Sequence, residues 1–183
     1  VTGAAAPGTT GAIFSKLSAP ALCNGFTGPG EIAFVGSLKS GVGDTENNGS
    51  NARGIWSNYG GTLDLYIRQG DTTELGGEFA SFEEIAIAED LGIIFDAKTS
   101  GVPSYANQVI GYCFAPGDFE IVARTGALVQ VGPTMKTIKS LQIFPLARNS
   151  MGQTRSFDAN LGDFVYTAIF TDGTWALFVV FFS

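Results

Sequence analysis

The chain contains no histidine among its 183 residues, so it lacks the side chain that most often acts as a general base or binds a transition metal. It has only two cysteines, Cys23 and Cys113, which are too far apart in sequence for a CxxC motif. This excludes a cysteine zinc site and a thioredoxin-like centre and leaves either one disulfide or two buried thiols. We therefore expect no enzymatic activity and no required cofactor.

Charged residues are also scarce, at 15% of the chain, and the net charge is −7. Affinity for nucleic acid comes mainly from Lys and Arg, so we expect no nucleic-acid partner. The longest apolar run, residues 176–182, is much shorter than the roughly 20 residues of a membrane-spanning helix. The first residues lack the basic and apolar regions of a signal peptide, as in a processed chain. We expect a protein without a membrane span.

Glycine and phenylalanine are abundant, with 25 and 15 copies, and 45% of the residues are hydrophobic. This composition is typical of many short strands joined by tight turns, with enough apolar material for one domain with a core. Two segments are nearly the same phrase, LDLYIRQGD at 63–71 and FEIVARTGA at 119–127. Each alternates apolar and other residues and then reaches an arginine and a glycine, which predicts a repeated strand and turn.

Three copies of a four-strand pattern follow from this repeat. The first copy has an opening, second, third and fourth strand at 14–17, 30–38, 53–58 and 63–70. The corresponding strands of the second copy are at 79–82, 91–99, 110–115 and 119–126. The third copy has its first three strands at 135–138, 162–170 and 174–179. The second strands align Ile32 with Ile93 and Phe164, and the third strands place Gly54 with Gly111. Small residues at Gly36, Ala97 and Ala168 predict a place where a neighbouring sheet approaches closely.

The predicted fold is all-β, with three four-stranded antiparallel repeats that resemble propeller blades; a β-prism or a sandwich is the alternative. A single domain, 1–183, contains repeats at about 11–74, 75–132 and 133–183. The last repeat lacks its fourth strand, and Val1–Ala4 aligns with the residues that follow a fourth strand, Arg124–Ala127. An open strand edge is a template for another chain. Since the last strand is apolar on both faces, we predict that assembly uses Leu177, Phe178, Val179, Val180 and Phe181.

Several segments carry a family resemblance: Phe14–Leu17, Pro20–Leu22, Ile32–Phe34, Gly54–Trp56, Leu63–Asp71 and FTDGTWALFV at 170–179. Their order resembles that of the choice-of-anchor tandem-repeat proteins of secreted or surface-anchored bacterial origin. The resemblance fades in the second repeat, where Ala127 stands in the place of Asp71. It implies an extracellular or cell-surface, β-rich repeat protein and brings no activity with it.

Polar candidates are few. Asp44, Glu46 and Asn48, in the loop 41–51, offer oxygen ligands of the kind that calcium prefers, against the alternative of an ordinary polar loop. Arg68 and Arg124 recur at equivalent positions, which predicts a structural role, such as holding a carboxylate or carbonyl of a neighbouring blade. Trp56 and Trp175 lie in the apolar pattern of the third strands and are predicted in the core.

An acidic cluster contains Glu83, Glu84, Glu89 and Asp90. Adjacent strand residues point to opposite faces, so Glu83 and Glu84 are not expected to share a site. The function expected from the sequence is an extracellular structural protein that self-assembles through open strand edges into a fibre or a ring. The alternative is a surface module that binds a glycan or calcium.

Overall fold

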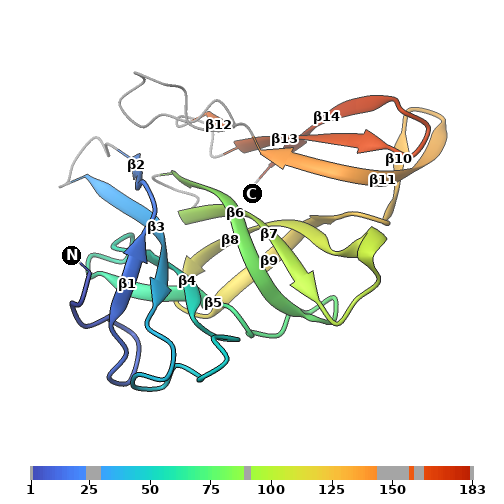
Figure 1. The fold of residues 1–183 in the computed structure, drawn as a ribbon. Coiled ribbons are helices and arrows are strands. Elements are labelled where there is room, and N and C mark those ends of the chain that lie inside the picture. Colours follow the sequence, from blue (N-terminus) through green and yellow to red (C-terminus); the bar gives the residue numbers. More distant parts are fainter. Residues whose placement is uncertain (1, 24–29, 89–91, 144–156, 159–162, 182–183) are drawn as a thin grey trace.

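The computed structural model describes residues 2–23, 30–88, 92–143, 157–158 and 163–181. This part of the chain is all-β: its strands form three antiparallel sheets, and its one helical segment is the 3-10 turn η1, Ser104–Ala106. Figure 1 shows the sheets following one another in chain order, from blue to red. The predicted fold class is confirmed. No helix of the described residues has the length and apolar character to cross a bilayer.

Sheet 1 contains the first repeat. Its strands are β1 (Phe14–Leu17), β2 (Ala21–Cys23), β3 (Glu31–Leu38), β4 (Arg53–Ser57) and β5 (Asp64–Arg68). The hydrogen-bonded order is β1-β3-β4-β5, and β2 also pairs with β3. Apart from β2, these are the four strands predicted for this repeat, joined as neighbours along the chain.

Sheet 2 contains the second repeat and is a simple meander. Its strands are β6 (Glu78–Ala88), β7 (Gly92–Ser100), β8 (Gln108–Ala115) and β9 (Asp118–Arg124), paired in this order. The opening strand β6 continues beyond Phe79–Phe82 through the alternating residues Ile85 and Ile87. All four predicted strands of the second repeat are therefore present.

Sheet 3 contains the third repeat. Its strands are β10 (Leu128–Val131), β11 (Thr134–Ile143), β12 (Phe157–Asp158), β13 (Asp163–Phe170) and β14 (Trp175–Val180). β10 forms a hairpin with β11, β13 lies between β11 and β14, and β12 pairs with β13. Among the described residues no strand corresponds to β5 or β9, so β14 lies at an edge, as the sequence predicted.

Strand register relates the three repeats more exactly than sequence similarity does. Gly36 lies opposite Gly54, Ala97 opposite Val109 and Ala168 opposite Ala176. The counterpart of Gly54 is therefore Val109, and the alignment of Gly54 with Gly111 is wrong by two positions. Gly111 has its own reason to be glycine, because a Cβ there would lie 2.6 Å from the Phe95 ring. The register of a strand is determined by its backbone hydrogen bonds. A glycine followed by an apolar residue, the signal used to align the third strands, does not determine it.

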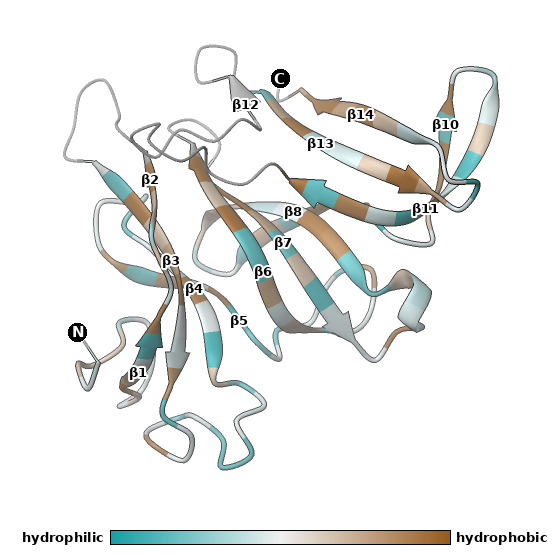
Figure 2. Ribbon diagram, turned by 45° about the horizontal axis from the view of Figure 1, so that its top comes forward, coloured by the Kyte–Doolittle hydropathy of each residue, from teal (hydrophilic) through white to brown (hydrophobic). Residues whose placement is uncertain are grey.

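The sheets are stacked in chain order, from left to right in Figure 2, and sheet 2 packs against sheet 1 on one face and against sheet 3 on the other. One core between sheets 1 and 2 includes Ile55, Ile67 and Phe95. A second core between sheets 2 and 3 includes Ile110 and Tyr166. Ile93 and Phe164 of the aligned column lie on the face of their sheet that packs against the preceding sheet, and Ile32 lies on the corresponding face of sheet 1.

The other face of sheet 1 has a smaller core built on rings. Trp56 is fully buried there, with its ring centroid 4.9 Å from that of Phe14. Trp56 Nε1–H donates to the Pro7 carbonyl, 2.9 Å away, so the N-terminal loop is held over this ring. The close approach predicted at Gly36 comes from these rings and not from another sheet, since a Cβ on Gly36 would lie 2.7 Å from Trp56.

Candidate assembly surface

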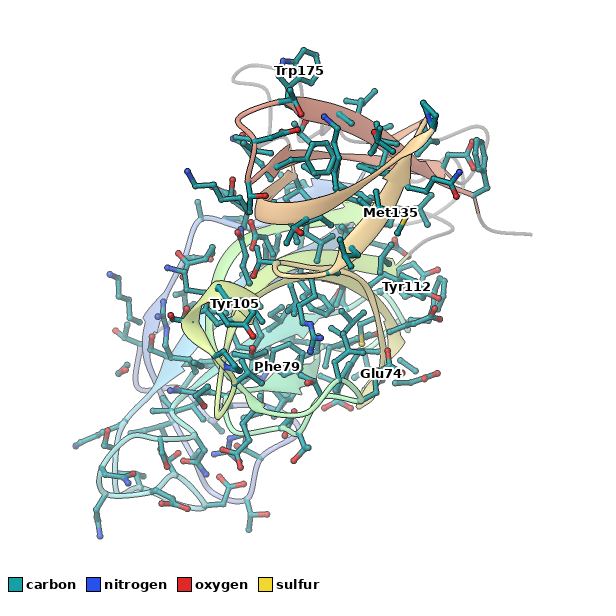
Figure 3. All side chains as sticks on the ribbon, turned by 90° about the vertical axis from the view of Figure 1, so that its right-hand side faces the viewer. Glu74, Phe79, Tyr105, Tyr112, Met135 and Trp175 are labelled. Atoms are coloured by element: carbon teal, nitrogen blue, oxygen red, sulfur yellow. The ribbon has the colours of Figure 1, made fainter. Side chains whose placement is uncertain are left out.

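The last strand, β14, has an uncovered side. Its residues alternate between exposed and half-buried along its length. Trp175 is 70% exposed, Leu177 52% and Val179 43%, and Ile169 of β13, which lies opposite Trp175, is 41% exposed. We call these four residues the outer face of sheet 3. Figure 3 shows Trp175 projecting from sheet 3 away from the rest of the protein. A group of exposed apolar residues of this kind is a candidate interaction surface.

Register shows that this face corresponds to buried faces elsewhere. Ile55 in sheet 1 and Ile110 in sheet 2 occupy the position of Leu177, one residue after Gly54, Val109 and Ala176. Both isoleucines are 0% exposed because the next sheet covers them, whereas Leu177 is 52% exposed. The outer face of sheet 3 is thus the face that the first two repeats bury against their successor.

The structure divides the five predicted assembly residues into two groups. Leu177 and Val179 lie on the outer face, and Phe181, which follows the strand, is 74% exposed. Phe178 and Val180 point the other way, and the Phe178 ring stacks on Tyr166 with a centroid distance of 5.2 Å. These two belong to the core, since successive strand residues face opposite sides. The sequence reasoning missed Trp175 as a surface residue, because the strand is apolar on both faces and its residues do not show which face is covered.

The prediction that both tryptophans lie in the core is wrong for Trp175. Trp56 is 0% exposed and Trp175 is 70% exposed. The register explains the difference, because Trp56 is opposite Phe34 on the ring-lined face of sheet 1, whereas Trp175 is opposite Ile169 on the outer face of sheet 3. The two residues occupy different positions of the repeat.

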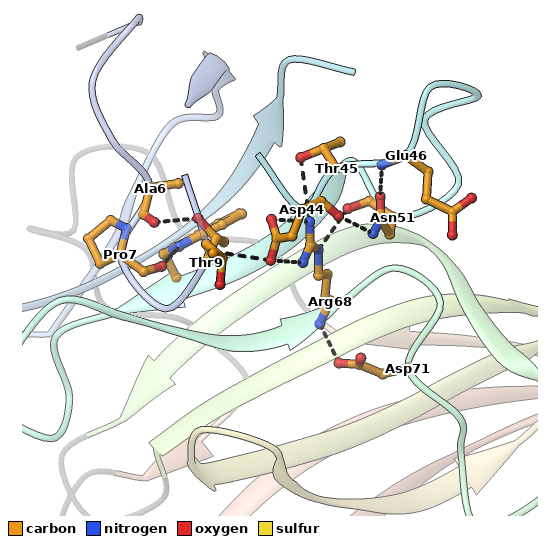
Figure 4. Close-up of polar contacts among 11 residues, drawn as sticks. Ala6, Pro7, Thr9, Asp44, Thr45, Glu46, Asn51, Arg68 and Asp71 are labelled. Carbon is orange, nitrogen blue, oxygen red and sulfur yellow. Dashed lines mark hydrogen bonds and ion pairs between the residues drawn. The ribbon is translucent and has the colours of Figure 1, made fainter. Parts of the chain in front are cut away.

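Arg68 joins three segments at one end of sheet 1 (Figure 4). Its guanidinium donates to both carboxylate oxygens of Asp44, at 2.9 and 3.1 Å, and its Nε–H donates to the Asn51 carbonyl at 2.8 Å. Asp44 also accepts from the Thr10 backbone N–H, which ties the N-terminal loop to the same point. The partner carboxylate lies in the loop between β3 and β4, so Arg68 holds its own repeat and not a neighbouring blade.

The predicted calcium ligands have other partners in this loop. The Arg68 guanidinium lowers the pKa of Asp44 below its ordinary value. Asn48 accepts from the Ser50 N–H, and Glu46 accepts from the Ser50 hydroxyl. The described residues contain no group of three or more His, Cys, Asp or Glu side chains that could hold a metal. Calcium binding by Asp44, Glu46 and Asn48 stays a prediction, to which the geometry gives no support.

Arg124, at the position of Arg68 in the second repeat, makes a weaker contact. One guanidinium nitrogen, Nη1, donates to the Leu75 carbonyl at 3.3 Å. The segment before β6 also contacts β9 through Glu74 Oε1, which accepts from the Ile121 N–H. Recurrence in the sequence therefore does not mean an identical partner.

This difference predicts unequal effects of truncation. Arg68→Ala removes the bidentate donor to the exposed Asp44 carboxylate and the donor to the Asn51 carbonyl, so we expect it to lower the free energy of unfolding by about 1–2 kcal/mol. Arg124→Ala loses one long hydrogen bond and is expected to cost less than about 1 kcal/mol. Urea denaturation of both variants measures the difference, and equal costs would contradict it.

Two adjacent glutamates, Glu83 and Glu84, line one groove between β6 and sheet 1. A register shift between Phe82 and Glu84 interrupts the alternation of β6, so both glutamates border the same space, contrary to expectation. The groove holds about 600 Å³, and Lys16 and Arg53 lie on its other side. Glu89 and Asp90 are outside the described residues. The aromatic residue in the lining, Phe82, is only 4% exposed, so it offers no ring surface on which a sugar could stack.

Cys113 is a free thiol that is fully buried between sheets 1 and 2. Burial raises its pKa to about 12, so the thiol stays protonated and unreactive at neutral pH. The alternative of a buried thiol therefore holds for Cys113, whereas the side chain of Cys23 is outside the described residues.

These features define a class of protein: an all-β chain of stacked four-stranded repeats, whose last sheet presents an open edge and an apolar face. The chain belongs to a family of unknown function, DUF7453, whose model matches residues 1–182. No curated protein matches the chain. No solved structure matches it either.

Proposed function

We propose that this protein is an extracellular structural protein that assembles with copies of itself through the edge and outer face of sheet 3. The observation that carries the proposal is the position of Leu177, 52% exposed where Ile55 and Ile110 are fully buried. A second copy laid on this face would give it the cover that the first two repeats already have.

The edge of β14 supports the same proposal. Among the described residues β14 pairs only with β13, so the N–H and C=O groups on its other side point outward. Adding a strand satisfies such groups, while the apolar side chains on the outer face supply the hydrophobic contribution. Charged residues or proline usually prevent a natural edge strand from pairing with another chain. Residues 175–180 contain neither.

The resemblance to secreted tandem-repeat proteins supports a place outside the cell. A contact between two different surfaces of identical copies continues from copy to copy, so the product is a ring when the rotation closes and a fibre when it does not. Of these two forms we favour the fibre.

A charge on the outer face is the sharpest test. Leu177→Lys places an ammonium group in the proposed contact, so we expect it to weaken self-association at least tenfold, equivalent to about 1.4 kcal/mol. Sedimentation velocity over a concentration series gives the association constant, and negative-stain microscopy gives the form of the assembly.

Tyr105→Lys is the matched control, because Tyr105 is 71% exposed but lies on η1 of the second repeat. It should leave association unchanged. A parent chain that remains a monodisperse monomer at high concentration would contradict the proposed function.

A further inference from the structure

The groove between sheet 1 and β6 has the size and the lining of a ligand site. Figure 2 shows β6 as the strand of sheet 2 that lies next to sheet 1. The groove volume of about 600 Å³ is within the range of about 300–1,000 Å³ that is usual for small-ligand sites. Its apolar lining is buried or half-buried and includes Ala21, Val35, Phe82 and Ile85. A ligand in the groove can therefore bury apolar surface while its polar groups meet the charged side chains around it.

The sheet 1 side of the groove is basic. Lys16 lies opposite Ser37, and Ser37 lies opposite Arg53, so the three residues form one row across β1, β3 and β4. Residues directly opposite one another share a face of the sheet, and all three line the groove. The row presents two cations and a hydroxyl, which are groups that bind a carboxylate.

The β6 side of the groove is acidic. Glu83 and Glu84 are both exposed there, because the register shift between Phe82 and Glu84 turns both toward the same space. Glu83 accepts a hydrogen bond from the Ser81 hydroxyl at 2.7 Å. No ion pair within the described part of the chain involves a charged group of the groove. Charges of both signs therefore border the groove without neutralising one another, and a ligand that carries both signs matches them.

The backbone of β6 favours a peptide as that ligand. β6 is at the edge of sheet 2, and over residues 81–85 its backbone pairs, among the described residues, with β7 alone. In an antiparallel strand the remaining N–H and C=O groups point to the other side, where an extended peptide can pair with them. Charges on an edge strand usually prevent such pairing. Here Glu83 and Glu84 restrict it to a segment with basic side chains.

We propose that this groove binds a short extended peptide segment that carries both acidic and basic side chains. The segment lies beside β6, with its carboxylates against Lys16 and Arg53 and its basic groups against Glu83 and Glu84. Backbone pairing supplies affinity, and the charged side chains supply specificity. This site is separate from the outer face of sheet 3, and it does not depend on self-assembly.

Isothermal titration calorimetry with the peptide acetyl-Glu-Lys-Glu-Lys-Glu-Lys-amide tests the proposal. An extended chain of this sequence has its acidic side chains on one side and its basic side chains on the other. We expect it to bind the parent protein, and hexaglutamate and hexalysine peptides to bind more weakly. Lys16→Glu and Glu83→Lys each replace an attraction by a repulsion, so each should raise the dissociation constant about fivefold or more.

Two matched controls separate the groove from the overall charge of the protein. Lys139→Glu and Glu78→Lys make the same changes of net charge at exposed residues that do not line the groove, and they should leave the dissociation constant unchanged. Circular dichroism checks that all four variants fold. Equal effects of control and groove variants would overturn the proposal, as would the lack of binding at millimolar peptide.

Hydrogen exchange tests the position of the peptide. At saturating peptide we expect slower exchange of backbone amides within residues 81–85, because the added strand covers the open side of β6. Unchanged exchange in this segment would overturn pairing beside β6. Neither experiment bears on the proposed function, which sedimentation velocity tests by itself.

Discussion

Trp56→Ala lowers the free energy of unfolding by about 3–5 kcal/mol, the largest effect expected of a single substitution in this protein. The indole is fully buried, contacts the Phe14 and Phe34 rings and donates to the Pro7 carbonyl. Its removal leaves a cavity in the smallest of the three cores and frees the N-terminal loop that it holds. Urea denaturation followed by circular dichroism measures the change.

The control is the other tryptophan. Trp175→Ala removes a side chain that is 70% exposed, so folding stability should change by less than about 0.5 kcal/mol when measured at a concentration where the protein is monomeric. Self-association should weaken in this variant and not in Trp56→Phe. Similar losses of stability for Trp56→Ala and Trp175→Ala would contradict the described division of the two residues between core and surface.

The second large effect concerns pH. Asp96 is 5% exposed at the junction of sheets 2 and 3, where both carboxylate oxygens lie 3.0 Å from Gln108 Nε2. Its pKa is raised to about 6: burial is the main cause, the hydrogen bond from Gln108 opposes it, Glu83 and Glu84 add to it, and Lys98 lowers it. Because the ordinary value is 3.8, the folded state holds this proton more tightly than the unfolded state.

The sign of the pH dependence follows. Below pH 3.8 Asp96 is protonated in both states, so its contribution to stability is complete; between pH 4 and 6 the unfolded chain loses the proton first, and the contribution is lost as the pH rises. The total change is at most about 3 kcal/mol. We expect Asp96→Asn to remove this decline and to unfold at higher urea concentration than the parent above pH 6.

The difference between the two stability curves isolates Asp96 from the other carboxylates. The lowered pKa values of Asp44 and Asp172 act in the opposite direction, since their contributions are lost as the pH falls below the ordinary range. Asp118→Asn, at the exposed first residue of β9, is the control and should follow the parent curve. A parent curve that matches Asp96→Asn between pH 4 and 7 would show that the carboxyl is not buried as described.

Much of the fold could be predicted from the sequence because its signals are local. The alternation in LDLYIRQGD and FEIVARTGA correctly placed β5 and β9, and the glycines correctly placed the turns at Gly70 and Gly126 that follow these strands. The alignment of Ile32, Ile93 and Phe164 was also correct, since Ile93 and Phe164 face the preceding sheet and Ile32 lies on the corresponding face of sheet 1. The alignment of Gly54 with Gly111 by sequence similarity was wrong. Each glycine is required by close contacts within its own repeat, and the two do not share a position.

The polar residues were harder to predict because their partners come from loops. Arg68 and Arg124 have the same place in the repeat, yet one meets the Asp44 carboxylate and the other the Leu75 carbonyl. These partners lie in segments of unlike length and composition, 39–52 and 69–77. A sequence repeat determines the position of an arginine on its strand. It does not determine which loop residue becomes the hydrogen-bond partner of that arginine, because loops vary between repeats.

The sequence by itself determined the four-strand pattern of the repeats, the order of those strands and the face that each apolar residue shares with its neighbours, because each depends on alternation and turn chemistry along the chain. Only the tertiary structure decided which of those faces are covered. β14 is apolar on both sides, and nothing in its own residues distinguishes Phe178, stacked on Tyr166, from Leu177, which is exposed. That distinction depends on whether another sheet lies against the strand, and sheet 2 covers only one side.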